Sequence, residues 1–212
     1  MSLFITFEGG EGSGKSVQAK ALFRRLSELA VPVLLTHEPG GTPFGEKLGH
    51  WLKWAKDAEI SPLTELMLFN ASRAQLVVEV IRPNLKSGKV VICDRYADST
   101  TVYQGYGREL ELAMVKATNK AATQGLKPDL TILLDIPVEE GLARKMARKQ
   151  DRFEQETLVF HNRVREGYLK LAAAEARRWL VVDASQSRQQ IAGIIWQRVS
   201  RLLEKGKNDK RT

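Results

Sequence analysis

The stretch Phe7–Ser16, which reads Phe-Glu-Gly-Gly-Glu-Gly-Ser-Gly-Lys-Ser, decides the fold of this chain. It follows the apolar run Leu3–Phe7 and precedes a segment with helical periodicity, Ser16–Leu29. The spacing Gly-x4-Gly-Lys-Ser, which begins at Gly9, is that of a phosphate-binding P-loop. A strand, a glycine-rich loop and a helix in this order predict a nucleotide-binding α/β protein.

The residue types in this loop suit a bound phosphate. Glycines reach the backbone angles of a tight turn and leave no side chain between the backbone N–H groups and the anion. These N–H groups and the N-terminus of the following helix together attract negative charge. Lys15 can reach the outer phosphates, and the Ser16 hydroxyl can bind Mg²⁺. A plain glycine-rich turn is the alternative, but the position at the start of an α/β pattern favours the P-loop.

Length and composition are those of one globular domain. The 212 residues are 43% hydrophobic, which is enough for one sizeable core and little for two. No apolar run reaches membrane-spanning length, and Met1 leads into the first strand without a signal-peptide pattern. The single cysteine, Cys93, excludes an intramolecular disulfide framework. We therefore expect a cytoplasmic protein with no membrane partner.

The net charge of +8 indicates anionic partners. Both nucleotides and nucleic acids are anionic, so the charge alone does not distinguish these two kinds of partner. The sequence has no helix-turn-helix or zinc-finger spacing and no basic strand rich in aromatic residues, so nucleic acid is not the expected partner. Part of the charge lies in the polar stretch 205–212, which we expect to be a disordered tail behind a single domain over residues 1–204.

Five apolar, strand-like runs alternate with helical patterns along the chain. This alternation predicts three α/β/α layers, in which helices cover both faces of a central, mostly parallel, five-stranded sheet. Together with the loop at residues 7–16, it indicates the P-loop NTPase fold. The expected strands are Leu3–Phe7, Val31–Thr36, Val90–Cys93, Leu130–Leu134 and Leu180–Val182. The expected helices are Ser16–Leu29, Phe44–Lys56, Pro62–Lys86, Leu110–Ala122, Val138–Met146, Glu156–Arg177 and Arg188–Leu203.

The functional site is expected at one edge of this sheet. Parallel sheets bind ligands beyond the carboxyl ends of their strands. Polar residues follow four of the five expected strands, at 8–16, 37–42, 94–104 and 183–187. In the second of these segments, Thr42 suits the N-cap of the helix that follows it.

Asp94 and Arg95 directly follow the third strand. An acid at the end of a buried strand can hold Mg²⁺ in P-loop proteins, directly or through water. Arg95 offers a planar fork of donors for a phosphate. Asp-Arg pairs are common on protein surfaces, but the position beyond a buried strand favours a functional pair.

Phe69 and Arg73 are four residues apart on the expected helix Pro62–Lys86, so they share one face. An aromatic ring beside a planar cation would suit a nucleobase that is stacked on the ring and hydrogen-bonded at its edge. An amphipathic helix with Phe69 in the core explains the same pattern, and the residues alone favour that interpretation.

Basic residues are concentrated between Arg144 and Arg152. Arg144, Arg148 and Arg152 recur every four residues, which in a helix would align like charges at a cost of roughly a few tenths of a kcal/mol per pair. A solvated face tolerates this cost. A mobile, arginine-rich lid that closes on a transferring phosphate explains the pattern better, and we expect it at about residues 144–154.

Further short motifs follow the P-loop in a characteristic order. Together they resemble the thymidylate kinase family, the dTMP kinases of the P-loop nucleoside monophosphate kinase group. The resemblance covers the chain from Phe4 to about Leu203. Each motif except the P-loop is a weak signal by itself, but the ordered set of motifs is highly specific for the family. The motifs are Glu-Pro-Gly-Gly-Thr at 38–42, Ala-Ser-Arg-Ala-Gln at 71–75, Asp-Arg-Tyr at 94–96, Ser-Thr at 99–100, Tyr-Gln-Gly at 103–105 and Asp-Arg-Phe-Glu at 151–154.

The resemblance implies phosphorylation of dTMP to dTDP by Mg²⁺-ATP, in dTTP synthesis, by a homodimer. Arg95 would bind the acceptor phosphate, Phe69 would stack on thymine and Arg73 would hydrogen-bond its edge. Tyr103 would lie against the deoxyribose, and Glu11 would meet the 3′-hydroxyl or steady Arg95. The dTMP site implied in this way is Glu11, Glu38, Pro39, Phe69, Arg73, Arg95, Ser99, Thr100, Tyr103 and Gln104.

The resemblance places ATP on the P-loop and the transition-state charge on a set of cations. This P-loop has no basic residue before Lys15, as in bacterial members, whose lids supply the cations instead. The implied catalytic residues are therefore Lys15, Arg95, Arg148 and Arg152. The implied metal ligands are Ser16 and Asp94, and the implied ATP site is Gly9, Gly10, Glu11, Gly12, Ser13, Gly14, Lys15, Ser16, Val17 and Arg144.

His37 departs from the family pattern, because an arginine often precedes Glu-Pro-Gly-Gly in the family. Other functions remain open on the residues alone. A kinase for another monophosphate or for a nucleoside would differ in its substrate profile. A nucleotide-driven switch or ATPase would hydrolyse ATP without an acceptor, and a nucleic-acid-binding module would show salt-sensitive DNA binding.

Overall fold

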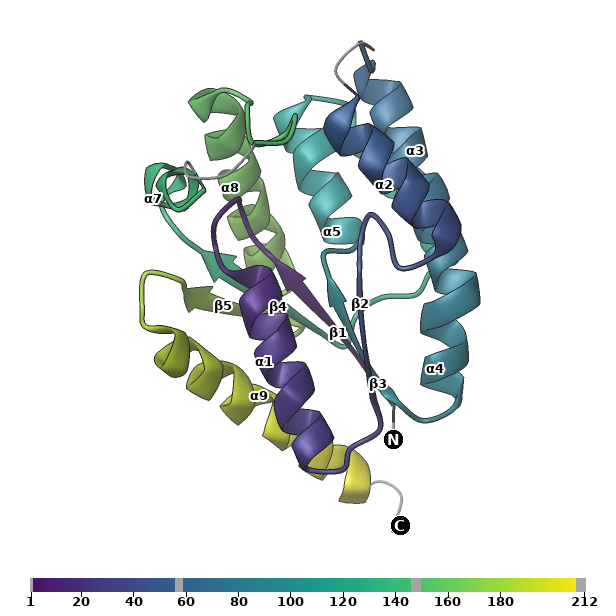
Figure 1. The fold of residues 1–212 in the computed structure, drawn as a ribbon, viewed down its shortest axis with the longest axis vertical. Helices are drawn as coiled ribbons and strands as arrows, with labels where there is room; N and C mark the ends of the chain where they lie inside the picture. Colours follow the sequence, from purple (N-terminus) through teal and green to yellow (C-terminus); the bar gives the residue numbers. More distant parts are fainter. Residues whose placement is uncertain (1, 56–58, 146–149, 209–212) are drawn as a thin grey trace.

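The computed structural model describes residues 2–55, 59–145 and 150–208, with side chains up to residue 204. One sheet runs through the middle of the molecule, and helices pack against both of its faces (Figure 1). This arrangement confirms the predicted α/β architecture.

All neighbouring strands of the five-stranded sheet run parallel, in the order β2-β3-β1-β4-β5. The central strand, β1, is buried along its whole length, including the polar residues Thr6 and Glu8. The register sets both Phe7 of β1 and His37 of β2 opposite Asp94 of β3, so the loops after these strands start at one edge. The strands are β1 (Leu3–Glu8), β2 (Val33–His37), β3 (Val90–Asp94), β4 (Leu130–Asp135) and β5 (Trp179–Asp183).

Helices fill the connections between the strands, and side-chain caps define where several of them begin. Thr42 Oγ1 accepts a hydrogen bond from the N–H of Gly45 at 2.9 Å, which confirms the predicted cap. Ser61 and Thr157 cap two later helices in the same way. The helices are α1 (Lys15–Glu28), α2 (Pro43–Trp54), α3 (Pro62–Leu76), η1 (Val77–Ile81), α4 (Arg82–Lys86), α5 (Ala97–Thr100), η2 (Thr101–Gly107), α6 (Leu112–Thr123), α7 (Val138–Ala143), α8 (Leu158–Ala174) and α9 (Arg188–Asn208).

The helix expected over Pro62–Lys86 is continuous but changes geometry along its length. It comprises α3, the π-helical η1 and α4. Pro83 has no N–H to donate and its ring crowds the preceding turn, and the wider π turn lies directly before it.

The segment after β3 is helical as well, which the sequence analysis did not predict. Nearly all residues of α5 and η2 are intermediate or buried, so no alternation of apolar and polar residues reveals these helices in the sequence.

The last helix, α9, is longer than predicted, because it continues to Asn208. The expectation of disorder from residue 205 therefore does not hold for residues 205–208, while 209–212 lie outside the described residues.

The described core has three clusters, one on one face of the sheet and two on the other. Apolar residues of α1 and α9, including Leu22, Leu26, Ile191 and Ile195, pack together on one face (Figure 1). On the other side, α8 packs against η2, and residues of α3 and η1 pack against β1 and β3. Helices cover both faces of the sheet, so a ligand can approach it at the carboxyl edge, where the loops lie.

Candidate active site

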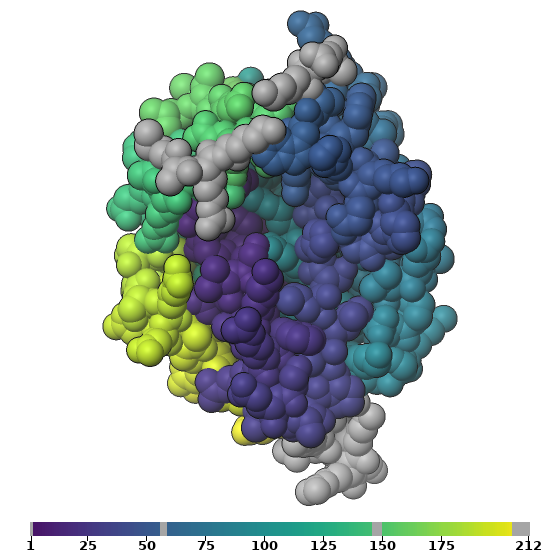
Figure 2. All heavy atoms as spheres, in the orientation of Figure 1, coloured from purple at the N-terminus to yellow at the C-terminus, as the bar shows by residue number. Residues whose placement is uncertain are grey.

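A cavity of about 1120 Å³ lies at the carboxyl ends of β1, β2 and β3. Figure 2 shows the surface hollowed between the purple P-loop region and the blue α2–α3 region. Its walls come from the P-loop, the ends of β2 and β3, the helices α3, α5 and η2, and the chain around the lid. The expected site residues that line it are Glu11, Gly12, Ser13, Gly14, Lys15, Ser16, Val17, Glu38, Pro39, Phe69, Arg73, Asp94, Arg95, Ser99, Thr100, Tyr103, Gln104 and Arg144.

The P-loop curls around the ammonium group of Lys15. Lys15 Nζ donates to the carbonyl oxygen of Gly10 at 2.6 Å and lies 3.3 Å from Ser13 Oγ. Gly14 adopts a left-handed conformation, with φ of 90°, directly before α1. The loop therefore leads into a helix N-terminus, with a cation at the centre of the turn.

Lys15 lies among charges of both signs. Burial and the neighbouring Arg95 lower the pKa of Lys15 to about 8, although Glu11, Asp94 and Glu8 act in the opposite direction. A phosphate brought to this site would favour the ammonium form and raise that pKa. A bound phosphate and the ammonium group of Lys15 would therefore stabilise each other.

Ser16 and Asp94 meet at the mouth of the P-loop. The Ser16 hydroxyl donates a hydrogen bond to Asp94 Oδ2, so the two oxygens are adjacent. Among the described residues there is no cluster of three or more acidic, histidine or cysteine side chains that could hold a metal ion. One carboxylate and one hydroxyl nevertheless fit Mg²⁺, which usually takes few protein ligands and completes its shell with phosphates and water.

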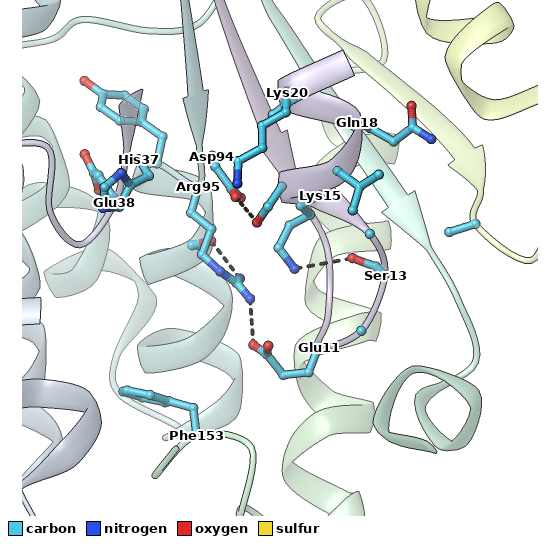
Figure 3. Close-up of a pocket in the computed structure, with 18 of the residues that line it drawn as sticks. Glu11, Ser13, Lys15, Gln18, Lys20, His37, Glu38, Asp94, Arg95 and Phe153 are labelled. Carbon is cyan, nitrogen blue, oxygen red and sulfur yellow. Dashed lines mark hydrogen bonds and ion pairs between the residues drawn. The ribbon is translucent and has the colours of Figure 1, made fainter. Parts of the chain in front are cut away.

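Arg95 points from the end of β3 toward the P-loop (Figure 3). Its Nη2 donates to Glu11 Oε1 at 2.6 Å, and its Nη1 donates to the carbonyl oxygen of Gly9 at 3.2 Å. Tyr103 donates to the same Glu11 oxygen at 2.7 Å, and its ring lies 5.0 Å from the guanidinium carbon. Burial alone would raise the pKa of Glu11, but Arg95 and Lys15 hold it well below its usual range. Glu11 therefore stays ionised and steadies Arg95.

Arg73 is buried, with 1% of its surface exposed, and it is held on all sides. Its Nε donates to Glu38 Oε2 at 2.8 Å, and its Nη1 donates to Asn70 Oδ1 at 3.2 Å and Asn119 Oδ1 at 2.9 Å. Its Nη2 donates to Thr100 Oγ1 at 2.8 Å. The side chain lines the cavity but already has these partners, so it joins α3 to α5 and α6.

Aromatic rings form the wall of the cavity away from the P-loop. Phe69 and Phe153 lie 5.6 Å apart between ring centroids, and Tyr103 and Phe153 lie 6.1 Å apart. Phe69 and Tyr103 are expected site residues, whereas Phe153 comes from the end of the lid. The lid segment therefore contributes directly to this wall.

Comparison with known proteins gives the family. A family model described as thymidylate kinase matches residues 7–195. The chain belongs to the thymidylate kinase family. The reaction of this family is the phosphorylation of dTMP to dTDP.

Relatives of the chain are similar along its whole length. A thymidylate kinase of Dehalococcoides mccartyi is 56% identical over 204 residues, which are 96% of this chain and 99% of the relative. One of Syntrophotalea carbinolica is 47% identical over 210 residues, which are 96% of this chain and 97% of the relative. The crystal structure of thymidylate kinase from Ehrlichia chaffeensis is similar, with a TM-score of 0.72 and 36% identity over 85% of this chain and 92% of that one.

The segment predicted to form the lid brings two cations to the cavity, Arg144 and Lys145. Arg144 Nη1 donates to the carbonyl oxygen of Ala184 at 3.1 Å, beside the loop after β5. Lys145 Nζ is hydrogen-bonded to Glu154 and lies 3.8 Å from Glu11 Oε2. Arg144 was expected here, whereas the sequence analysis assigned no role in the site to Lys145.

Arg152 does not reach the cavity in this structure, contrary to its expected place at the transferring phosphate. Its Nη2 donates to Glu65 Oε2 at 2.6 Å, and its Nε donates to the carbonyl oxygen of Leu52 at 3.2 Å. Glu65 is completely buried and also binds Gln104 and Arg108, because a buried carboxylate needs donors and positive charge around it.

Other expected residues lie at the rim or outside the description. Gly9 and Gly10 belong to the P-loop but do not line the cavity. Arg148 lies outside the described residues. His37, the departure from the family pattern, lies 3.0 Å from Glu46 on α2 with about half of its side chain exposed.

The sequence analysis did not predict that three buried residues, Glu8, Glu65 and Tyr168, bind side chains that line the cavity. Glu8 ends β1 and is completely buried, and burial and the charge of Asp98 raise its pKa to about 7. An acidic residue at the end of an apolar strand is unusual, and this could have drawn attention to Glu8. Nothing in the sequence pattern distinguishes Glu65 or Tyr168 from other helical residues. Over the described part of the chain, no helix is long and apolar enough to span a membrane.

Proposed function

We propose that the chain transfers the γ-phosphoryl group of ATP to the 5′-phosphate of dTMP, with Lys15 and Arg95 binding the two reacting phosphates. The observation that carries this assignment is that both cations lie in one cavity (Figure 3). A P-loop alone would serve any nucleotide hydrolase. A second cation, the partly buried Arg95, faces the P-loop from the end of β3 and calls for a second anionic ligand.

The acceptor phosphate is itself the nucleophile, so the reaction needs no general base from the protein. The obstacle is the repulsion between two anions that must meet in line. Lys15 exchanges the Gly10 carbonyl for a phosphate oxygen, and Arg95 keeps Glu11 while turning its longer hydrogen bonds toward the acceptor. Both cations stabilise the charge that spreads over the transferring group.

Ser16 and Asp94 would hold Mg²⁺, directly or through water. Their adjacent oxygens are the hard ligands that this ion prefers. The bound ion offsets negative charge on the phosphates of ATP. The P-loop residues from Gly9 to Val17 bind those phosphates, and Arg144 contacts the nucleoside end.

The wall of Phe69, Tyr103 and Phe153 would hold the thymidine part of dTMP. Phe69 stacks on the base, and Tyr103 lies against the sugar. Arg73 would hydrogen-bond the edge of the base by exchanging a partner of its Nη2, which donates to Thr100 Oγ1 at 2.8 Å and to the carbonyl oxygen of Tyr96 at 3.3 Å. Glu38 and both asparagines anchor the rest of the guanidinium. The remaining contacts are assigned to Glu38, Pro39, Ser99, Thr100 and Gln104.

The lid, residues 144–154, supplies further cations within a single catalytic domain, residues 1–204. Arg148 and Arg152 are assigned to the transition state, and Arg152 takes part only after it exchanges Glu65 for a phosphate. Closure of the lid excludes water and so prevents transfer of the phosphoryl group to water.

A homodimer that buries the α2–α3 face is also proposed. These two helices pack against each other, and Phe44, Trp51, Leu63 and Met67 on them are between 43% and 49% exposed. Exposed apolar side chains on adjacent helices are typical of an interface. No membrane or nucleic acid partner is proposed, in line with a cytoplasmic location.

Substrate profiling tests the assignment. ADP release is measured with ATP and each of dTMP, dUMP, UMP, CMP, AMP and GMP, and with ATP alone. We expect dTMP to give the highest kcat/KM and ATP alone to give almost no ADP. Preference for a purine or for CMP would exclude the proposed acceptor, and rapid ADP release without any acceptor would indicate a hydrolase.

A further inference from the structure

Glu8 is a completely buried carboxylate beside the cavity residues Arg95 and Ser99, and the transfer described above does not use it. Its Oε1 accepts a hydrogen bond from the backbone N–H of Tyr96 at 2.8 Å. Its Oε2 accepts one from Ser99 Oγ at 2.6 Å and one from Tyr168 Oη at 2.9 Å. The carboxylate thus joins β1 to α5, to α8 and to the loop that carries Arg95.

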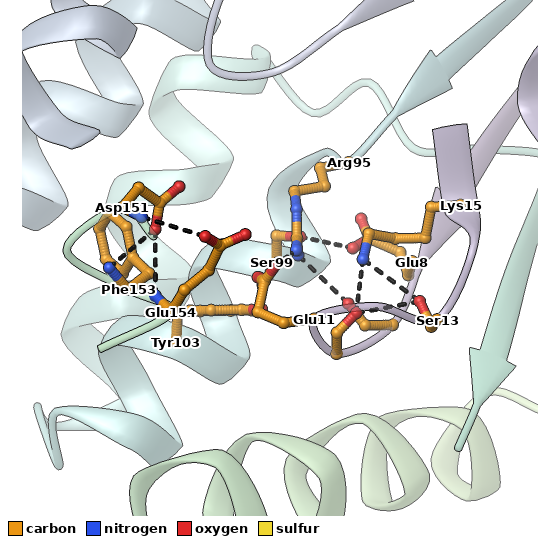
Figure 4. Close-up of polar contacts among 12 residues, drawn as sticks. Glu8, Glu11, Ser13, Lys15, Arg95, Ser99, Tyr103, Asp151, Phe153 and Glu154 are labelled. Carbon is orange, nitrogen blue, oxygen red and sulfur yellow. Dashed lines mark hydrogen bonds and ion pairs between the residues drawn. The ribbon is translucent and has the colours of Figure 1, made fainter. Parts of the chain in front are cut away.

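Two hydroxyl groups lie between Glu8 and Arg95. Arg95 Nη1 is 3.3 Å from Ser99 Oγ and 3.4 Å from Tyr168 Oη, and the two hydroxyl oxygens are 2.9 Å apart. Figure 4 shows Ser99 beside both Arg95 and Glu8. Glu8 and Arg95 form no direct ion pair in the described structure, so the hydroxyl groups provide the connection.

The charge of Glu8 dictates where the hydroxyl protons point. Above its pKa, which burial and Asp98 raise to about 7, Glu8 is ionised. The carboxylate then only accepts hydrogen bonds, so it draws the protons of Ser99 and Tyr168 toward itself. The oxygen lone pairs of both hydroxyls then remain for Arg95, which only donates. A neutral group at position 8 would donate to one hydroxyl and turn that hydroxyl's proton toward the N–H of Arg95.

We propose that Glu8 is a positioning residue, which acts through Ser99 and Tyr168 to hold Arg95 in the orientation that binds the acceptor phosphate. The inference rests on the proposed role of Arg95. Arg95 has a left-handed backbone, with φ of 70°, a conformation that a side-chain-bearing residue keeps only when its surroundings stabilise it. The bond from Tyr96 N–H to Glu8 fixes the backbone directly after that residue.

A purely structural role explains Glu8 less well. A buried carboxylate without a directly paired cation is costly for the fold. Asp98 adds a like charge nearby, although Arg178 binds Asp98 at 2.7 and 2.9 Å. The other titratable groups that face Glu8 are Lys15, Cys93, Arg95 and Tyr168. A neutral side chain of the same shape would cost the fold less, so stability does not explain the acid.

The test compares Glu8→Gln and Tyr168→Phe with Tyr106→Phe as the matched control. Tyr106 also lies where η2 meets α8, against Gly167, but in the described structure it bonds to neither Glu8 nor Arg95. Initial rates are measured with varied dTMP and with varied ATP, together with thermal unfolding. Glu8→Gln is also made in an Arg95→Ala background.

We expect Glu8→Gln and Tyr168→Phe to lower kcat/KM for dTMP by about tenfold or more, as for a lost hydrogen bond to a charged group. The KM for ATP should stay within about twofold, and the Tm of Glu8→Gln should not fall, since no charge is then buried. In the Arg95→Ala background, Glu8→Gln should cost less than about twofold, because both changes remove one interaction. Tyr106→Phe should match wild type.

The outcomes separate this inference from the function on which it rests. If Arg95→Ala loses activity while Glu8→Gln stays within about threefold of wild type, the role of Glu8 is wrong and the proposed function stands. Equal losses from Glu8→Gln in both backgrounds, or a lower Tm with parallel losses for both substrates, would make Glu8 structural. If Arg95→Ala itself retains activity, the proposed role of Arg95 is wrong.

Discussion

Arg95 is the residue on which the proposed reaction depends most. It faces the P-loop, its pKa is raised by Tyr103 and Glu11 despite burial, and it therefore stays charged. The sequence predicted its position beyond β3. The ion pair with Arg95 also explains why the P-loop contains an acid, Glu11. Without this arginine, the Glu11 carboxylate would only repel bound phosphates.

We expect Arg95→Ala to lower kcat/KM for dTMP by at least about a hundredfold, the scale of a lost donor to developing charge. Steady-state rates with varied dTMP measure the effect. Arg198→Ala is the control, since that arginine donates to the Arg177 carbonyl on the far side of the molecule from the cavity. A loss of less than about threefold would exclude Arg95 from the phosphate site.

Glu8 should make stability depend on pH. Burial raises its pKa from 4.5 to about 7, so between these values the folded protein holds a proton that the unfolded chain releases. This stabilisation is complete below about pH 4.5 and is lost as the pH rises through 7. From pH 5 to 8, the free energy of unfolding should fall by up to about 3 kcal/mol more in wild type than in Glu8→Gln. Urea unfolding at both pH values measures this, and equal changes would contradict it.

At the scale of elements, the P-loop depends on its contact with α7. A Cβ on Gly12, whose φ is 67°, would lie 1.8 Å from the carbonyl oxygen of Gly141. The tip of the loop therefore rests on the backbone of α7, and only glycine allows this approach.

We expect Gly12→Ala to displace the P-loop and to lower kcat/KM for ATP on the order of a hundredfold, as small misplacements of reacting groups do. Gly193→Ala on α9 is the control. A Cβ there meets no atom within 4 Å, and alanine should stabilise the helix by about 0.5–1 kcal/mol. Similar kinetics for the two variants would show that the contact with α7 does not shape the P-loop.

Glu65 connects the segment predicted to form the lid to η2, whose Gln104 lines the cavity. It binds Gln104 of η2 at 2.6 Å, Arg152 of the lid at 2.6 Å and Arg108 at 3.3 Å. Arg108 in turn lies 2.6 Å from Glu156. This cluster anchors the end of the lid against α3 and η2.

Glu65→Ala should destabilise the protein by about 3–5 kcal/mol, because it leaves the partly buried Arg152 without a carboxylate and leaves Arg108 with Glu156 alone. Urea unfolding measures the change. Glu166→Ala, which removes an exposed partner 3.9 Å from Lys170, should have little effect. A small loss for Glu65→Ala would mean that the arginines find other partners in solvent.

At the scale of the whole molecule, we expect a dimer through the α2–α3 face. Trp51→Glu and Met67→Glu should shift the protein toward monomer, since each places a charge on a proposed apolar interface. Sedimentation or light scattering at several concentrations measures the shift. Val181→Glu, at a side chain of β5 that is 48% exposed, should leave the assembly unchanged. A wild-type monomer would exclude the proposed dimer.

Local patterns predicted the elements that are themselves local. All five apolar strand runs coincide with the observed strands to within about two residues, and the cap at Thr42 is as expected. The helix after β3 was missed, because its burial on several sides removes the periodicity that indicates a helix. Contacts between residues that are distant in the sequence were also missed, such as those of Glu65 with Gln104, Arg108 and Arg152.

The sequence by itself determined the phosphate loop, the alternation of strands and helices, the residues beyond each strand and the family. Each of these depends on neighbours along the chain or on an ordered set of motifs. Only the tertiary structure decided that Arg73 is anchored on all sides, that Arg152 binds Glu65 and that Glu8 is connected to Arg95. A side chain's partners depend on which elements the parallel sheet brings together, and the spacing of residues along one chain does not contain that information.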